Sequence, residues 1–159
     1  MFAPKPFDVA KEMVRVTKPG GQIVMGNWIP NDPTSFVSQL LKISSSYTPP
    51  PPEGFVSPMT WGVETNIVER FGAAGVQPDR IEMKRDTFTF ASPDRTPEDF
   101  IDVFRSYYGP TMNAYEAAEK AGSVGKLHGE LVALAHEQNR ASAGGFAIPA
   151  TFMRITVRL

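Results

Sequence analysis

The sequence predicts one α/β domain over residues 1–159, because helical stripes and short apolar strands alternate along the chain. Residues 22–28 form an apolar run directly after a Lys-Pro-Gly-Gly turn, a pattern typical of a central parallel strand buried on both faces. Residues 152–159 instead alternate apolar and polar side chains, which indicates a strand with one buried face. The long stretch between them ends in three helical segments, which predict a helical insertion before the last strand.

Composition excludes several classes of protein. With 159 residues, 42% of them hydrophobic, and a formal net charge of -1, the chain can build one packed core and has no field that favours nucleic acid or an anionic membrane. It shows no signal-peptide pattern, and no segment approaches the roughly 18 apolar residues of a spanning helix, so a cytoplasmic location is expected. The absence of cysteine excludes disulfides, thiolate zinc sites and cysteine nucleophiles.

The first half of the chain reads as helix, strand, helix and helix. The first helix is predicted over residues 7–17 and is ended by the glycines of the turn at 19–21. A second helix is expected to begin at Asp32, which can cap it, with Pro33 in the first turn, and the prolines at 49–52 end it. A third helical stripe covers residues 63–71.

The second half begins with a strand whose buried face changes. Ile81 and Met83 alternate in one phase and Phe88 and Phe90 in the other, which predicts a bulge or bend near residues 85–86. Helical segments are then expected from Thr96, which caps the first of them, and over residues 111–121 and 123–139.

Four segments together resemble class I S-adenosylmethionine-dependent methyltransferases. Residues 12–28 look like the helix, turn and fifth strand of that family, and residues 47–52, 57–62 and 104–111 are similar to a bacterial small-molecule subgroup, methyltransferase type 11-like. The resemblance implies the C-terminal part of a Rossmann-like fold, with a mixed sheet in the order fifth, seventh, sixth strand. The fifth and sixth strands would be parallel, with the last strand antiparallel between them.

The resemblance also shows what the chain lacks. The family holds S-adenosylmethionine with a glycine-rich loop after the first strand and with acidic residues near the ribose and adenine, and no segment here matches them. Residues 1–4 look like the end of the family's fourth strand. The chain is therefore expected to be a truncated methyltransferase that is inactive alone. The alternative is a non-catalytic domain of the same origin that binds a small molecule or dimerises.

The resemblance implies an acceptor site without naming the acceptor. In the family the loop after the fifth strand and the helical insertion build the acceptor pocket, which on this chain implies the following residues: Asn27, Trp28, Trp61, Phe104, Tyr107 and Tyr108. The aromatic residues can equally be core residues. No catalytic residue is assigned, because a general base is needed only when the acceptor loses a proton. His128 and His136 have no partner at ligand spacing, so no metal is expected.

The resemblance further predicts self-association. The family's fifth strand is interior to the sheet, whereas here only residues 1–4 match its neighbour, the fourth strand. Residues 22–28 should therefore present a bare edge without charge or proline, which is a template for pairing with another chain.

Overall fold

A computed structural model describes residues 3–159 as a mixed α/β protein with two compact units. The first unit comprises the described residues up to Pro30, together with Pro52–Asp86 and Thr151–Leu159. The second unit comprises Asn31–Pro51 and Thr87–Ala150. Strands β2 (Ile81–Ser92) and β3 (Phe146–Arg158) contribute residues to both units.

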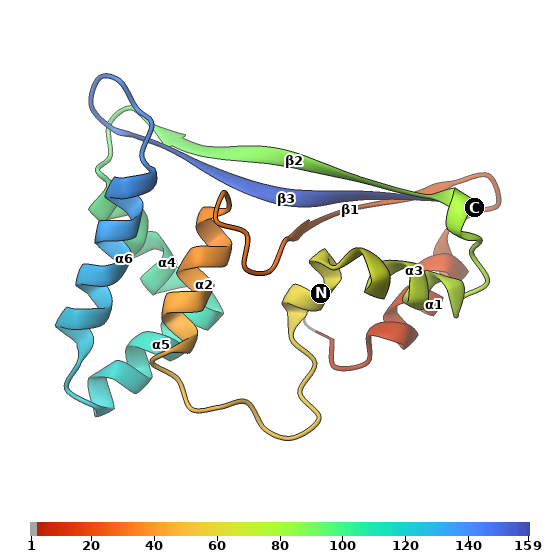
Figure 1. Cartoon of the computed structure of the whole chain (residues 1–159), viewed down its shortest axis with the longest axis horizontal. Coiled ribbons are helices and arrows are strands. Elements are labelled where there is room, and N and C mark those ends of the chain that lie inside the picture. The colour runs from red at the N-terminus through yellow and green to blue at the C-terminus, as the bar shows by residue number, and fades with distance from the viewer. Residues whose placement is uncertain (1–2) are drawn as a thin grey trace. The chain divides into compact units, whose positions relative to one another are not determined.

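The described residues form a three-stranded antiparallel sheet in the order β1-β3-β2 (Figure 1). Strand β1 (Gln22–Trp28) pairs antiparallel with β3, in a register that runs from Gln22 opposite Arg158 to Trp28 opposite Phe152. On the other side of β3, Arg158 donates to Glu82 of β2 over 2.6 Å. The predicted order, with the last strand in the middle, is confirmed.

The link between the first helix and β1 is held by the end of the chain. Helix α1 (Pro6–Val16) is followed by a turn in which Gly20 has a φ of +76°, a conformation that favours glycine. The Gly20 N–H donates to the carbonyl of Leu159, and the Leu159 N–H donates to the carbonyl of Gly21, each over 3.0 Å. The turn therefore closes the β1-β3 ladder at this end of the sheet.

The prediction that β1 is buried on both faces is wrong. Its exposure alternates, and the Val24 side chain is 60% exposed. The reason is that β1 is an edge strand of the described sheet, and helices of its unit cover only the face that carries Ile23 and Met25. Of the proposed fourth-strand remnant, residues 1–2 lie outside the described residues, and Ala3 and Pro4 are not in a strand.

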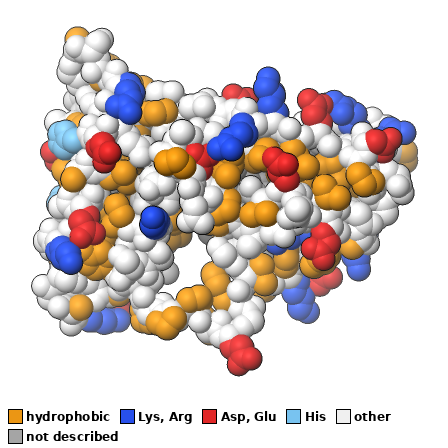
Figure 2. All heavy atoms as spheres, viewed as in Figure 1, with side chains coloured by type: hydrophobic (Ala, Val, Ile, Leu, Met, Phe, Trp, Pro, Cys, Tyr) orange, Lys and Arg blue, Asp and Glu red, His pale blue; other side chains and the backbone are white. Residues whose placement is uncertain are grey.

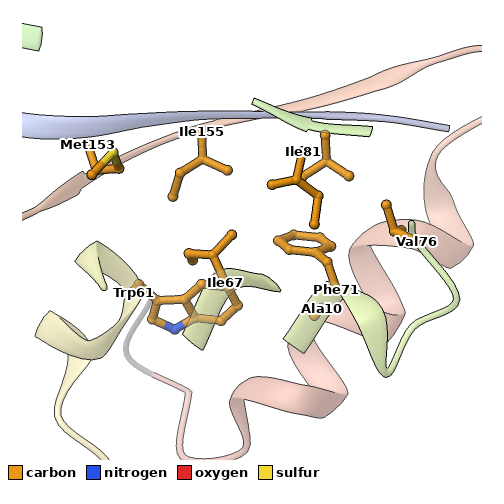
Figure 3. Packing of buried hydrophobic residues seen from close by; sticks show 9 residues of the cluster. Ala10, Trp61, Ile67, Phe71, Val76, Ile81, Met153 and Ile155 are labelled. Atoms are coloured by element: carbon orange, nitrogen blue, oxygen red, sulfur yellow. The ribbon is translucent and has the colours of Figure 1, made fainter. Parts of the chain in front are cut away.

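The core of the first unit lies between this face of the sheet and three helical segments. These segments are helix α1, the 3-10 helix η1 (Pro58–Gly62) and helix α3 (Glu64–Gly72). Figure 3 shows Trp61, Ile67 and Phe71 beneath side chains of the strands. Burial of each large apolar side chain contributes about 1.5–3 kcal/mol. The buried members of the cluster are Ala10, Trp61, Ile67, Phe71, Val76, Ile81, Met153, Ile155 and Val157.

Both long strands change their buried phase where the chain passes from one unit to the other. In β2, Ile81 and Met83 pack into the core of the first unit, whereas the ring of Phe90 lies 5.2 Å from that of Phe100 in the second. This confirms the predicted change of phase, although β2 is assigned as one continuous strand through residues 85–86. In β3 the buried positions switch between Ala150 and Thr151, which are both buried.

The second unit is mainly helical. Its helices are α2 (Phe36–Ser45), α4 (Pro97–Tyr107), α5 (Gly109–Lys120) and α6 (Val124–Gln138). The rings of Phe36, Phe100 and Phe104 pack against one another at centroid distances of 5.0 to 5.7 Å. Thr96 caps α4, as predicted, because its hydroxyl accepts from the Asp99 N–H. The structure adds that the Asp99 side chain accepts from the Thr96 N–H, which completes a capping box.

The start of α2 differs from the prediction. The helix begins at Phe36, and Asp32 instead forms a turn in which its Oδ1 accepts from the N–H and the hydroxyl of Thr34, over 2.8 and 2.6 Å. An aspartate can bond to the backbone two residues later as readily as it caps a helix, and the sequence pattern does not separate the two.

The lengths of the helices and the distribution of surface charge agree with what the composition predicts. No helix in residues 3–159 is long and apolar enough to cross a membrane. Figure 2 shows acidic and basic side chains interspersed over the visible face, without a large area of one sign.

We predict that the chain self-associates through the edge of β1. Among the described strands β1 pairs only with β3, and it carries no charged residue, whereas the other edge strand β2 carries Lys84 and Arg85. Val24→Lys should shift the chain towards monomer, because a charge on an exposed edge opposes strand addition. Light scattering measures the mass, and Val16→Lys, at an equally exposed position on α1, should leave it unchanged. A monomeric parent chain contradicts the prediction.

Candidate functional site

The six predicted site residues are divided equally between the two units. Asn27, Trp28 and Trp61 belong to the first unit, and residues 104, 107 and 108 belong to the second.

The three predicted aromatic residues of the second unit differ in their exposure to solvent, and only Tyr108 is half-buried. Phe104 is 8% exposed and packs into the ring cluster of α4 as a core residue. Tyr107 is 83% exposed. The ring of Tyr108 lies edge-on to Phe104 at 5.3 Å, and burial raises the pKa of its hydroxyl. Tyr108 is thus the better candidate of the pair for contact with a ligand.

In the first unit, Trp28 and Asn27 lie on opposite faces of β1. Trp28 and Phe152 lie on the face of the sheet that the helices of this unit do not cover. The centres of their rings are 6.2 Å apart, and the rings are arranged edge to face. Asn27 lies on the face that carries Met25 and is 4% exposed. Its register partner Met153 belongs to the buried core cluster. The Asn27 carboxamide is therefore enclosed at the carboxyl end of β1.

The segment η1 packs directly on this end of β1. The hydroxyl of Ser57 accepts from the Met59 N–H over 3.3 Å, and the hydroxyl of Thr60 donates to the Ser57 carbonyl over 2.7 Å. A Cβ at Gly62 would collide with the carbonyl oxygen of Trp28, so only glycine allows this approach. These contacts place Trp61, which is 3% exposed, in the core beside β1.

Arg70 of α3 is the polar partner of η1. Its side chain is 4% exposed, and its Nη2 donates to the Thr60 hydroxyl over 2.7 Å. The guanidinium carbon lies 4.5 Å from the centre of the Trp61 ring, a cation–π contact. Burial lowers the pKa of Arg70, and the nearby charge of Glu69 opposes that shift.

Two buried donors of this region have no hydrogen-bond partner among the described residues. They are Nη1 of Arg70 and Nδ2 of Asn27. Most buried polar groups in proteins are bonded, so such donors need an explanation. We call the set Asn27, Thr60, Trp61 and Arg70 the η1 polar cluster.

Sequence reasoning identified two members of this cluster and missed Arg70. A signal was present, because Arg70 is spaced three residues after Ile67 and next to Phe71, and both of those are fully buried. This spacing places it on the buried stripe of α3, where a charged residue is unusual. Thr60 was seen only as part of a family segment.

The histidines form local pairs on the helices of the second unit. Nδ1 of His128 lies 2.7 Å from the hydroxyl of Tyr115, and Nε2 of His136 lies 2.6 Å from Oε1 of Glu98. The bond from His136 lowers the pKa of Glu98. Across residues 3–159 no three His, Cys, Asp or Glu side chains are grouped so that they could hold a metal ion.

The described residues do not fit a nucleoside cofactor by themselves. The turn glycine Gly20 already uses its N–H in the bond to Leu159, so it offers no cradle for a ligand. Asp32, an acidic residue near the end of β1, is held by Thr34. A shallow apolar hollow along α1, which Val9 and Met13 help to line, includes none of the predicted site residues.

Comparison with known proteins gives relatives but no activity. No protein-family model matches the chain. The uncharacterized protein Rv1403c of Mycobacterium tuberculosis is 31% identical over 140 residues, which are 86% of this chain and 48% of the relative. A second uncharacterized protein of that organism, Rv1405c, is 30% identical over 140 residues, covering 85% of this chain and 47% of its own length. The chain thus spans about half the length of the curated relatives it matches.

Thr60→Val should destabilise the chain. It removes the acceptor of the buried Arg70 Nη2 and a bond to Ser57, and a buried donor left without a partner costs about 1–3 kcal/mol of the free energy of unfolding. Urea unfolding measures the change. Thr65→Val is the matched control on exposed α3 surface and should stay within about 0.5 kcal/mol of the parent. Equal stability of the two variants would show that Thr60 does not support Arg70.

Proposed function

We propose that this chain forms the acceptor-binding portion of a class I S-adenosylmethionine-dependent methyltransferase that acts on a small molecule. The observation that carries the proposal is the sheet order β1-β3-β2. A final antiparallel strand inserted beside the first described strand corresponds to the order of fifth, seventh and sixth strands that the sequence resemblance implies. The finer assignment, a Rossmann-like methyltransferase fold, is part of this proposal.

The helical segments support the same reading. Helices α4, α5 and α6 follow β2 and precede β3, which is where the resemblance places an insertion that contributes to the acceptor pocket. The fold alone does not define an activity, because one fold supports many chemistries. The proposal therefore rests on the sheet order together with the family segments of the sequence.

Methyl transfer requires the protein mainly to align the acceptor with the methyl group. S-adenosylmethionine supplies an activated methyl group, so the enzyme must hold the acceptor in line with it and exclude water. At the end of β1, the Asn27 carboxamide can donate to an acceptor and the Trp61 ring supplies an apolar wall. We assign no general base, since that requirement depends on the acceptor atom.

Cofactor binding is assigned, in this proposal, to segments that the chain does not contain. The relatives support this division, because the chain matches only about half of their length. The chain alone is then inactive, and the activity belongs to a longer protein. A cytoplasmic location is also part of the proposal, and the lack of cysteine is compatible with a reducing compartment.

The alternative is a non-catalytic domain that binds a small molecule or dimerises. It is favoured by the edge of β1, which pairs with no described strand other than β3 and carries no charge to oppose pairing. A stable dimer of the chain, together with the absence of methyl transfer in the longer relatives, would support this alternative.

Titration calorimetry with S-adenosylmethionine tests the proposal. Full-length Rv1403c should bind the cofactor with a dissociation constant near micromolar, about -8 kcal/mol, whereas the chain alone should give no measurable heat. A full-length relative that does not bind would contradict the methyltransferase assignment. Micromolar binding by the chain alone would instead contradict the assignment of the cofactor to other segments.

A further inference from the structure

Arg70 is a buried charge that forms no ion pair with a carboxylate of the described residues, although the charge of the neighbouring Glu69 acts on it through space. Its side chain is 4% exposed, and no carboxylate of the described residues bonds to it. By contrast, the ion pairs Arg15–Glu12, Lys120–Glu116 and Arg158–Glu82 all lie on the surface. Removing a charge from water costs several kcal/mol unless a partner compensates. Thr60 and Trp61 compensate Arg70 in part, and Nη1 stays unpaired.

Asn27 adds a second unpaired donor in the same unit. Its side chain is 4% exposed, and its Nδ2 has no partner within residues 3–159. The segment η1 connects the two donors, because Gly62 touches the backbone next to Asn27 and Thr60 bonds to Arg70. Both donors therefore lie around the same short segment, on the helix-covered side of β1.

The chemistry of the cluster selects its ligand. Its two unpaired groups are N–H donors, and the cluster contains no acidic side chain that would compete for them. A guanidinium presents a planar fork of donors that matches a carboxylate, and charge-assisted bonds of this kind are the strong ones. The Trp61 ring would pack against an apolar or aromatic body attached to that carboxylate.

We propose that the η1 polar cluster binds the carboxylate of a small organic acid, with Arg70 as the charged ligand and Asn27 as the second donor. The site does not depend on methyl transfer for its existence. If the proposed methyltransferase function also holds, the acceptor belongs to the class of carboxylic acids, and that step alone rests on the proposed function.

Entry to the site requires η1 to move. Nη1 of Arg70 is buried in the structure, and η1 is a five-residue 3-10 helix. Short 3-10 segments have poorer hydrogen-bond geometry than α-helices, so they open at lower cost. Residues 51–56, which precede the capping residue Ser57, are exposed, and Phe55 is 55% exposed. A ligand would enter through a transient opening of η1 on this side and would contact Trp61 once η1 has closed again.

The test titrates the full chain with acetate and with benzoate. Binding is monitored by the NMR signals of the Arg70 Nε–H and of the Asn27 side-chain amide. Both probes should shift these two signals with saturation, and acetamide, the neutral analogue of acetate, should not. Absence of saturable shifts with either carboxylate overturns the proposal. Equal shifts with inorganic phosphate at matched ionic strength overturn the assignment to carboxylates.

Variants separate binding from folding. Arg70→Gln should weaken benzoate binding by more than about tenfold, because the charge is lost. Arg80→Gln, at an exposed position of the same unit, should bind as the parent does. Since Arg70→Gln can also unfold the chain, Asn27→Asp is the second variant: it keeps Arg70 and Thr60 but repels a carboxylate. A folded Asn27→Asp chain that binds benzoate with unchanged affinity would overturn the proposal.

Discussion

The pairing of β3 with its neighbours is the constraint on which the rest of the structure depends. The strand contributes Met153, Ile155 and Val157 to the core of the first unit and Ile148 to that of the second. It also anchors the turn before β1 through the bonds of Leu159 with Gly20 and Gly21. Residues from both parts of β3 therefore belong to the two cores, and Leu159 holds the turn that begins β1.

The approach of η1 to the end of β1 has the same importance for the candidate site. Because Gly62 has no side chain, Trp61 reaches the core and Thr60 comes within bonding distance of Arg70. The apolar packing stabilises the unit, whereas the guanidinium above the Trp61 ring is only partly compensated. A buried charge that is only partly compensated is a reasonable place to look for function.

Short sequence patterns predicted most helices and strands, and the errors arose where contacts between distant segments determine the structure. The cap at Thr96 and the change of phase in β2 follow from short patterns, and both are present. The prediction that β1 is buried on both faces was wrong, because an apolar run does not show whether a strand is central or at an edge. The strand β3 begins at Phe146, earlier than predicted, because the prediction rested on the alternation of residues 152–159. The residues before Thr151 are buried in the opposite phase and include Pro149, which is unusual in a strand interior. For the site, Asn27 and Trp61 were predicted from the family segments. Arg70 was missed although its spacing from Ile67 places it on the apolar stripe of α3, and the structure shows that it is buried there.

The change of phase between Ala150 and Thr151 limits how this chain can vary in length. Side chains of a strand alternate with a period of two, so one residue inserted after Thr151 would turn Met153, Ile155 and Val157 away from their core together. A single-residue deletion would do the same. Length changes should therefore be confined to segments outside the ladder, such as the proline-rich loop before η1. The spacing from Thr151 to Leu159 should be invariant wherever this fold is retained.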